Sequence, residues 1–136
     1  NYQSKKGIEL EANPSCALTF FWPDLERQVR IEGIAERVDV KTSEAYFQSR
    51  PRGSQIGAWA SPQSTIIQDR SLLEKRFVQI EKKYQGLDAL PRPYQWGGYQ
   101  VDPFVVEFWQ GRPGRVHDRI EYTKVENIWR IHRLAP

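Results

Sequence analysis

The chain has 136 residues, a size that fits one domain or one domain with a small dimerisation extension. Lys and Arg number 20 against 17 Asp and Glu, so the net charge of +3 is too small to indicate nucleic acid as the partner. One cysteine excludes an intrachain disulfide framework, and with only two histidines we expect no metal site and a reducing, cytoplasmic location.

The beginning of the sequence lacks the methionine with which a translated chain starts. No methionine occurs in the chain, which starts at Asn1, so we expect residues that precede it or that were processed away. The opening residues do not resemble a signal peptide. The longest apolar run, Ala17–Trp22, is far shorter than a membrane span, so we expect no membrane partner.

The first predicted elements are two strands. The apolar run Ser15–Trp22 predicts a buried strand that ends at Pro23. Alternation over Arg27–Val38 predicts a second strand, antiparallel to the first. Gly33 within it predicts a bulge or a close backbone approach.

Helices are predicted in the middle of the chain. The residues Thr42-Ser43-Glu44 are of the type that begins helices, and they predict a helix that runs to Arg50. A short helical turn over Ser54–Ala60 and a polar loop over Ser61–Thr65 follow. The spacing of apolar residues over Ser71–Gln85 predicts a further helix.

Three more strands are predicted near the end of the chain, over Val105–Trp109, Arg115–Tyr122 and Ile128–Leu134. Turns at Gly111–Gly114 and Glu126–Asn127 separate them. The fold class is therefore mainly β with two or three inserted helices, consistent with an antiparallel barrel or sandwich.

One group of basic residues lies in the strand predicted to begin at Arg115. Residues two apart share a strand face, so Arg115, His117 and Arg119 are expected to project together and to form a candidate site for an anionic ligand. The alternative is a solvated strand face with Glu121 as a partner, which the residues alone slightly favour.

A second candidate site combines a phenol, a guanidinium and a hydroxyl. Tyr46 and Arg50 are four residues apart on a predicted helix, and Ser54 follows just beyond Pro51. These groups suit a phosphate monoester. The alternative is an ordinary amphipathic helix, which the trio alone favours.

Further polar side chains suit hydrogen bonding to a phosphate or a heterocycle, although each could be an ordinary surface residue. They are Lys5, Lys6, Gln28, Gln63 and Ser64. Trp109 could form a wall against a flat ring or pack in a core.

Taken together, these segments resemble the pyridoxine (pyridoxamine) 5'-phosphate oxidase family over essentially the whole chain. The stretches that carry the resemblance are Ser4–Gly7, Glu26–Val29, Tyr46-Phe47, Ser49–Arg52, Ser54–Ala58, Gln63-Ser64, Trp96–Tyr99, Glu107–Gly111, Arg115–Arg119 and Arg133–Pro136. The resemblance implies an FMN-binding split β-barrel, antiparallel, that works as a homodimer with FMN at the subunit interface.

The resemblance also implies roles for individual residues. The positions that match the FMN-binding residues of the family are Lys5, Lys6, Gln28, Gln63, Ser64, Trp109 and Arg119. Those that match the substrate-phosphate site are Tyr46, Arg50 and Ser54, and Arg115 and His117 match catalytic and substrate-binding positions at the pyridine ring. The family commonly has Arg where this chain has Lys5, which keeps the charge but loses the forked donor geometry.

The implied activity is an FMN-dependent oxidase of vitamin B6 salvage. It would convert pyridoxamine 5'-phosphate and pyridoxine 5'-phosphate to pyridoxal 5'-phosphate, with O2 as acceptor and H2O2 as product. Residues 1–90 would be the remainder of the split-barrel domain with inserted helices, and residues 91–136 the C-terminal dimerisation region. Upstream strands that complete the phosphate sites in the family are expected before Asn1.

Two alternatives stay open. The chain could be a truncated, non-catalytic form that dimerises or binds pyridoxal 5'-phosphate. It could also be a related split-barrel flavin oxidase that acts on another heterocycle, such as a phenazine precursor. The set Tyr46, Arg50 and Ser54 argues against the second alternative, because those groups suit a phosphorylated substrate.

Overall fold

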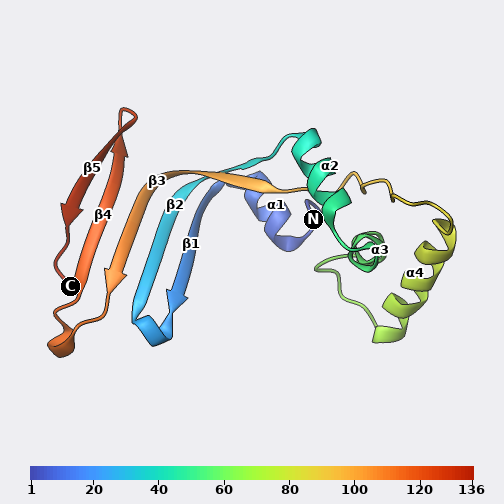
Figure 1. Ribbon diagram of the computed structural model, residues 1–136, viewed down its shortest axis with the longest axis horizontal. Coiled ribbons are helices and arrows are strands. Elements are labelled where there is room, and N and C mark those ends of the chain that lie inside the picture. Colours follow the sequence, from blue (N-terminus) through green and yellow to red (C-terminus); the bar gives the residue numbers. More distant parts are fainter. The chain divides into compact units, whose positions relative to one another are not determined.

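The computed structural model describes all residues from Asn1 to Pro136 (Figure 1). The elements in chain order are α1 Lys5–Ala12, β1 Ser15–Trp22, the 3-10 turn η1 Pro23–Leu25, β2 Arg27–Arg37, α2 Val40–Ser49, α3 Arg52–Ala60, α4 Arg70–Lys83, β3 Tyr99–Gln110, the 3-10 turn η2 Pro113–Arg115, β4 Asp118–Val125 and β5 Ile128–Arg133. The prediction of a mainly β class with inserted helices is confirmed, with four helices instead of two or three. None of these helices is both long and apolar enough for a membrane crossing.

The chain divides into two compact units that alternate along the sequence. The helical unit comprises Asn1–Ala12 and Arg37–Tyr99, and the sheet unit comprises Asn13–Glu36 and Gln100–Pro136. These units describe packing, so the predicted functional division after residue 90 stays a prediction.

The five strands form one antiparallel sheet in the order β1-β2-β3-β4-β5. The bounds predicted for β1 and its antiparallel pairing with β2 are confirmed. Gly33 pairs in regular register with Cys16, and a Cβ built on it would lie 2.5 Å from the carbonyl oxygen of Asp102. The glycine therefore permits a close backbone approach and does not form a bulge.

The two faces of the sheet differ in chemistry. Directly paired residues share a face, and the ion pair of Arg30 with Glu107 places alternate residues of β2 on the same face as those of β3. The polar face carries Gln28, Arg30, Glu32, Glu107, Trp109, Arg119 and Glu121. The opposite, apolar face carries Leu18, Phe20, Trp22, Val29, Ile31, Val106, Phe108, Ile120, Tyr122 and Ile131.

The expectation that Ser15–Trp22 is a buried strand is wrong. Its aromatic residues are largely exposed, with Phe20 at 46%, Phe21 at 58% and Trp22 at 45%. The reason is that β1 lies at the edge of the sheet, and the sheet unit contains no second layer of elements to cover its faces.

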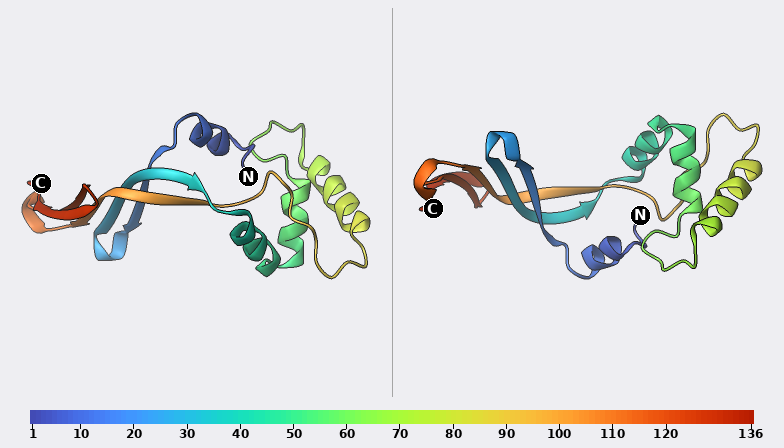
Figure 2. Two further views of the ribbon diagram at one scale, coloured as in Figure 1. Left: turned by 90° about the horizontal axis from the view of Figure 1, so that it is seen from above. Right: turned by 90° about the horizontal axis from the view of Figure 1, so that it is seen from below.

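The helical unit has its own small core. Phe47 of α2, Ile56 of α3, Tyr84 at the end of α4 and Leu90 of the following connector form a buried cluster. The helices α3 and α4 lie side by side in the views of Figures 1 and 2. Burial of apolar area in this cluster is the main force that holds the helices together.

The helices begin earlier than predicted because aspartates cap them. Asp39 accepts a hydrogen bond from the backbone N–H of Thr42 at 2.8 Å, so α2 starts at Val40. Asp69 accepts from the N–H of Ser71 at 2.7 Å, and α4 starts at Arg70. In α3, Pro51 occupies the N-cap and the helix starts at Arg52.

The start predicted for the strand at Arg115 is also wrong, since β4 begins at Asp118. Gly114 and Arg115 adopt the left-handed conformation, with φ of 70° and 63°, and turn the chain before the strand. Arg115 and His117 therefore lie outside the strand, and the expected shared strand face of Arg115, His117 and Arg119 does not form. The strand predicted over Val105–Trp109 is longer, because β3 begins at Tyr99.

Candidate active site

Trp96 brings Tyr46 and Arg50 together in the helical unit. The ring of Tyr46 stacks on Trp96 with centroids 5.9 Å apart, and the guanidinium carbon of Arg50 lies 5.1 Å from the Trp96 ring centroid. The helix α2 ends at Ser49, and Arg50 follows with an extended backbone. The two side chains are therefore joined by the indole ring of Trp96, which was not among the predicted site residues, and not by helical spacing.

A pocket of about 290 Å³ adjoins this aromatic platform, lined among others by Arg50, Ser54, Gln63 and Trp96. The Nη1 atom of Arg50 is buried and has no hydrogen-bond partner in the chain. Buried donors are nearly always paired, and a charged one most of all. An unpaired guanidinium nitrogen on a residue that lines the pocket makes the pocket a candidate site for an anionic group.

The backbone of Arg50 is held by Gln55, a second residue that was not among the predicted site residues. The Gln55 side chain is buried, and its Nε2 donates to the carbonyl oxygens of Phe47, Gln48 and Arg50 at 3.2, 3.3 and 3.0 Å. Carbonyls at the end of a helix lack intrahelical partners, and Gln55 supplies one to Gln48 and Arg50, whereas the carbonyl of Phe47 also accepts from the backbone N–H of Arg50 at 3.2 Å. A buried amide in the first turn of α3 thus fixes the chain at the point where Arg50 enters the pocket.

The remaining predicted residues of the helical unit lie at its surface. Lys5 and Lys6 are exposed on α1, and the Nζ of Lys5 lies 3.9 Å from Glu9. Gln63 is an exposed residue at the edge of the pocket. Ser64 is exposed in the following loop with φ of 66°.

Three predicted residues of the sheet unit share the polar face of the sheet. Trp109 and Arg119 are directly opposite each other in the register of β3 and β4. Gln28 lies two residues from Arg30 and thus on the same face. An indole ring, a guanidinium and an amide are therefore gathered on this face.

Arg119 is held by a buried carboxylate. Its Nε and Nη2 donate to the two carboxylate oxygens of Glu107 at 2.7 and 3.2 Å, and its Nη1 donates to the carbonyl oxygen of Ala135 at 3.0 Å. Arg30 lies 3.6 Å from the same carboxylate. The hydrogen bond from Arg119 holds the pKa of Glu107 below its usual value, although burial acts in the opposite direction.

His117 lies beside Trp109 instead of beside Arg119. The two ring centroids are 4.7 Å apart. The backbone N–H of Arg112 donates to His117 Nδ1 at 3.1 Å, so the neutral imidazole carries its proton on Nε2. Arg115 is exposed in the turn that precedes it.

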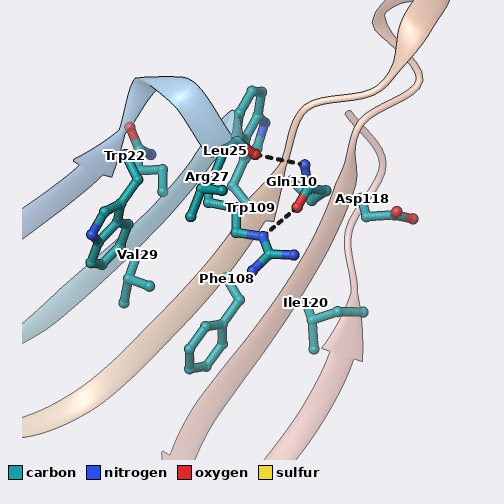
Figure 3. A pocket seen from close by; sticks show the side chains of 10 residues that line it. Trp22, Leu25, Arg27, Val29, Phe108, Trp109, Gln110, Asp118 and Ile120 are labelled. Carbon is teal, nitrogen blue, oxygen red and sulfur yellow. Dashed lines mark hydrogen bonds between the residues drawn. The ribbon is translucent and has the colours of Figure 1, made fainter.

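A second pocket, of about 440 Å³, lies in the sheet unit (Figure 3). Trp22, Val29, Phe108 and Ile120 supply apolar side chains to it, and Gln28 and Trp109 also line it. Arg27 Nε donates to Gln110 Oε1 at 2.7 Å, and Gln110 Nε2 donates to the carbonyl oxygen of Leu25 at 3.1 Å (Figure 3). Two of the predicted cofactor residues thus border a hollow with apolar walls.

The predicted site residues are therefore distributed over both units. The helical unit holds Lys5, Lys6, Tyr46, Arg50, Ser54, Gln63 and Ser64, and the sheet unit holds Gln28, Trp109, Arg115, His117 and Arg119. In the helical unit the structure brings together Tyr46, Arg50 and Ser54, through Trp96 and the shared pocket. In the sheet unit Trp109 lies beside His117 and pairs in register with Arg119, but His117 and Arg119 are not brought into contact.

Comparisons with known proteins agree on one family. Residues 1–84 match the family model described as pyridoxamine 5'-phosphate oxidase, and residues 96–136 match the model described as pyridoxine 5'-phosphate oxidase C-terminal dimerisation region. Curated relatives include the pyridoxine/pyridoxamine 5'-phosphate oxidases of Synechocystis sp. at 53% identity and of Ectopseudomonas mendocina at 55%. All of this chain aligns with each, and it spans 63% of the length of these relatives.

Two solved structures resemble the chain. PhzG from Burkholderia lata, in complex with tetrahydrophenazine-1-carboxylic acid, has a TM-score of 0.90 at 28% identity, over 98% of this chain and 65% of that one. A pyridoxamine 5'-phosphate oxidase-related, FMN binding protein from Nostoc punctiforme has a TM-score of 0.68 at 14% identity, over 100% and 70%. The second likeness concerns the fold alone. With both family models matched in sequence order, this chain belongs to the pyridoxamine 5'-phosphate oxidase family.

Proposed function

We propose that the protein of which this chain is part is an FMN-dependent oxidase of vitamin B6 salvage. It converts pyridoxamine 5'-phosphate and pyridoxine 5'-phosphate to pyridoxal 5'-phosphate, uses O2 as acceptor, releases H2O2 and works as a homodimer. Its family and the names of its relatives support this assignment. The single observation that carries it is the buried, unpaired Nη1 of Arg50, a residue that lines the same pocket as Ser54.

The substrate phosphate fits the pocket of the helical unit. A phosphate monoester supplies the acceptor that Arg50 lacks, and the guanidinium supplies charge and forked donors in return. Ser54 lies in the first turn of α3, where the helix dipole also favours an anion. Tyr46 is held against Trp96 with its hydroxyl available as a neutral donor.

FMN fits the chemistry of the predicted cofactor residues. Trp109 offers a flat apolar surface, Gln28 and Arg119 lie on the same face of the sheet, and the exposed amines of Lys5 and Lys6 suit a phosphate dianion. Gln63 and Ser64 would add neutral hydrogen bonds from their loop. When bound, FMN supplies the redox chemistry, in which the amine- or alcohol-bearing carbon of the substrate is oxidised and O2 accepts the electrons.

The chain's own residues would bind and orient the substrate ring. His117 is held by Arg112 with its proton on Nε2, so it presents a fixed hydrogen-bond donor. Arg115 places an exposed guanidinium two residues earlier, where it can hold an electron-rich ring substituent. Both residues would act by orientation and polarisation, and no side-chain nucleophile is required.

We also propose that residues 91–136 form the dimerisation region and that residues 1–90 are the remainder of the split-barrel domain. The family model over residues 96–136 supports the first part. Cross-linking and sedimentation of the full-length protein test it, and a monomer at micromolar concentration would contradict it.

A second candidate function is oxidation of another heterocycle. The structural likeness to PhzG, solved with a tetrahydrophenazine carboxylic acid, favours it. A carboxylate could also pair with Arg50. The phosphate reading is preferred because a guanidinium, a phenol and a hydroxyl together offer more donors than one carboxylate needs.

Substrate comparison with the full-length, FMN-loaded protein tests the proposal. We expect oxygen consumption with pyridoxamine 5'-phosphate and at least about a hundredfold lower kcat/KM with unphosphorylated pyridoxamine, because two or more charged hydrogen bonds are lost. Equal kcat/KM values for the two substrates would contradict the proposed phosphate site. Turnover of a tetrahydrophenazine carboxylic acid alone would favour the second candidate, and FMN binding without any turnover would favour a non-catalytic form.

A further inference from the structure

Glu107 is a buried carboxylate next to a residue that the proposed function assigns to the cofactor. It is 4% exposed and lies on the polar face of β3. Each of its oxygens accepts one hydrogen bond from Arg119, from Nε at 2.7 Å and from Nη2 at 3.2 Å. This two-pronged geometry fixes both the position and the plane of a guanidinium. Glu107 therefore sets the orientation of the Arg119 head group.

The donors of Arg119 are only partly used within the chain. A guanidinium has five N–H groups, of which Glu107 takes two and the carbonyl oxygen of Ala135 takes a third. Two N–H groups therefore remain, on a side chain that is 30% exposed. They are available to a ligand on the polar face, where Trp109 lies directly opposite Arg119.

A role in sheet stability alone accounts poorly for this carboxylate. Glu107 lies directly opposite Glu121 in the register, and like charges on paired strands repel each other. An apolar side chain would fill the position without burying a charge. Two guanidiniums, those of Arg119 and Arg30, compensate the charge instead.

We propose that Glu107 is a positioning residue for FMN binding, which holds the Arg119 guanidinium so that its two remaining N–H groups are presented to the flavin. The proposal rests on the proposed function, because that function assigns Arg119 to the cofactor. The carboxylate does not touch the flavin itself. It removes the rotational freedom of Arg119 before the cofactor arrives, so less entropy is lost on binding.

The test measures FMN affinity of the full-length apoprotein by quenching of flavin fluorescence. Glu107→Gln keeps the shape of the side chain but replaces a charge-assisted pair with a neutral one, and we expect the Kd for FMN to rise about tenfold. Glu121→Gln is the matched control, since it removes the same charge from the same face directly across the register. We expect its Kd to stay within about twofold of the wild-type value.

A double-mutant cycle separates positioning from stability. If Glu107 acts through Arg119, Glu107→Gln has no further effect on the Kd in an Arg119→Ala background. Additive effects in the cycle, or a wild-type Kd for folded Glu107→Gln, would overturn the proposal. Thermal unfolding of each apoprotein identifies the folded variants, and Glu107→Asp, which keeps the charge but shortens the reach, takes the place of a Gln variant that does not fold.

FMN binding by the wild type separates failure of the proposed function from failure of the Glu107 role. A wild-type protein that does not bind FMN contradicts the proposed function, and the role of Glu107 falls with it. A wild-type protein that binds FMN and a Glu107→Gln variant that binds equally well contradict only the role of Glu107.

Discussion

The guanidinium carbon of Arg50 lies 5.1 Å from the centre of the Trp96 ring, and Nη1 of the same guanidinium is buried without a hydrogen-bond partner. Trp96 is in turn held through its backbone, because the guanidinium of Arg92 donates to its carbonyl oxygen and also pairs with Glu44 at 3.0 Å. The indole thus acts as a fixed platform. A cation over such a ring keeps its position while its N–H groups stay free for a ligand.

Removal of this platform should weaken substrate binding. For Trp96→Ala we expect the KM for pyridoxamine 5'-phosphate to rise about tenfold, because a cation–π contact contributes roughly 0.5–2 kcal/mol and Tyr46 also loses its stacking partner. Trp96→Phe keeps a ring and should lose less. Steady-state kinetics give both values, and Tyr94→Phe, at an exposed tyrosine, is the control. An unchanged KM in Trp96→Ala would contradict the platform role.

Substitution of Arg50 should erase the preference for phosphorylated substrates. In Arg50→Ala we expect kcat/KM for pyridoxamine 5'-phosphate to fall about ten- to a hundredfold, the effect of losing hydrogen bonds to a charged group, while that for pyridoxamine stays nearly unchanged. Arg70→Ala removes an 88% exposed arginine and serves as the control. If kcat/KM falls equally for both substrates in Arg50→Ala, the residue stabilises the fold and does not bind the phosphate.

Acid should destabilise the protein in part through Glu107. Its pKa is lowered in the folded state, chiefly by the hydrogen bond from Arg119, so the unfolded chain binds more protons at low pH. The stabilisation is complete above the unfolded pKa of about 4.3 and is lost as the pH falls through the lower folded pKa. Urea unfolding between pH 6 and pH 3 should show a smaller loss of stability in Glu107→Gln than in the wild type.

Some acid sensitivity should persist in that variant. The pKa values of Asp39, Asp69 and Asp118 are also lowered, by hydrogen bonds from Thr42, Ser71 and Arg112 respectively. These carboxylates act in the same direction. If the free energy of unfolding falls equally steeply with pH in Glu107→Gln and in the wild type, the Glu107 carboxylate contributes nothing to the pH dependence.

Two glycines offer a matched pair of stability predictions. In Gly33→Ala the new methyl group would lie 2.5 Å from the carbonyl oxygen of Asp102, so we expect a loss of about 2 kcal/mol or more. Gly53→Ala lies in α3 with open space around it and should stabilise by about 0.5–1 kcal/mol. Denaturant unfolding measures both. An unchanged free energy of unfolding in Gly33→Ala would show that β2 and β3 tolerate a wider separation there.

The sequence predicted the first two strands best, since the bounds of β1 were correct and those of β2 differed only at its last residue. The start of β4 was missed because the period-two pattern runs through Arg115 and His117, while the left-handed φ values of Gly114 and Arg115 leave no mark on hydrophobicity. The helix α1 was missed for a different reason. Gly7 within it disfavours a helix, but there a Cβ would collide with the carbonyl oxygen of Tyr2, so packing outweighs propensity.

The candidate site was predicted by residue type but not by arrangement. The resemblance supplied Tyr46, Arg50 and Ser54, whereas the partner that joins two of them, Trp96, comes 46 residues after Arg50. Gln55 looks like any polar residue of a helix until its three carbonyl partners are seen. Long-range contacts of this kind have no local pattern in a single sequence.

The edge position of β1 bears on how the protein is handled in the laboratory. One side of the strand offers main-chain N–H and C=O groups without a neighbouring strand, next to exposed Leu18, Phe20 and Trp22. An open, aromatic edge is a template for pairing with further chains. A preparation limited to these 136 residues should therefore self-associate and precipitate as its concentration rises. The substitution Phe20→Lys should raise the concentration at which it precipitates.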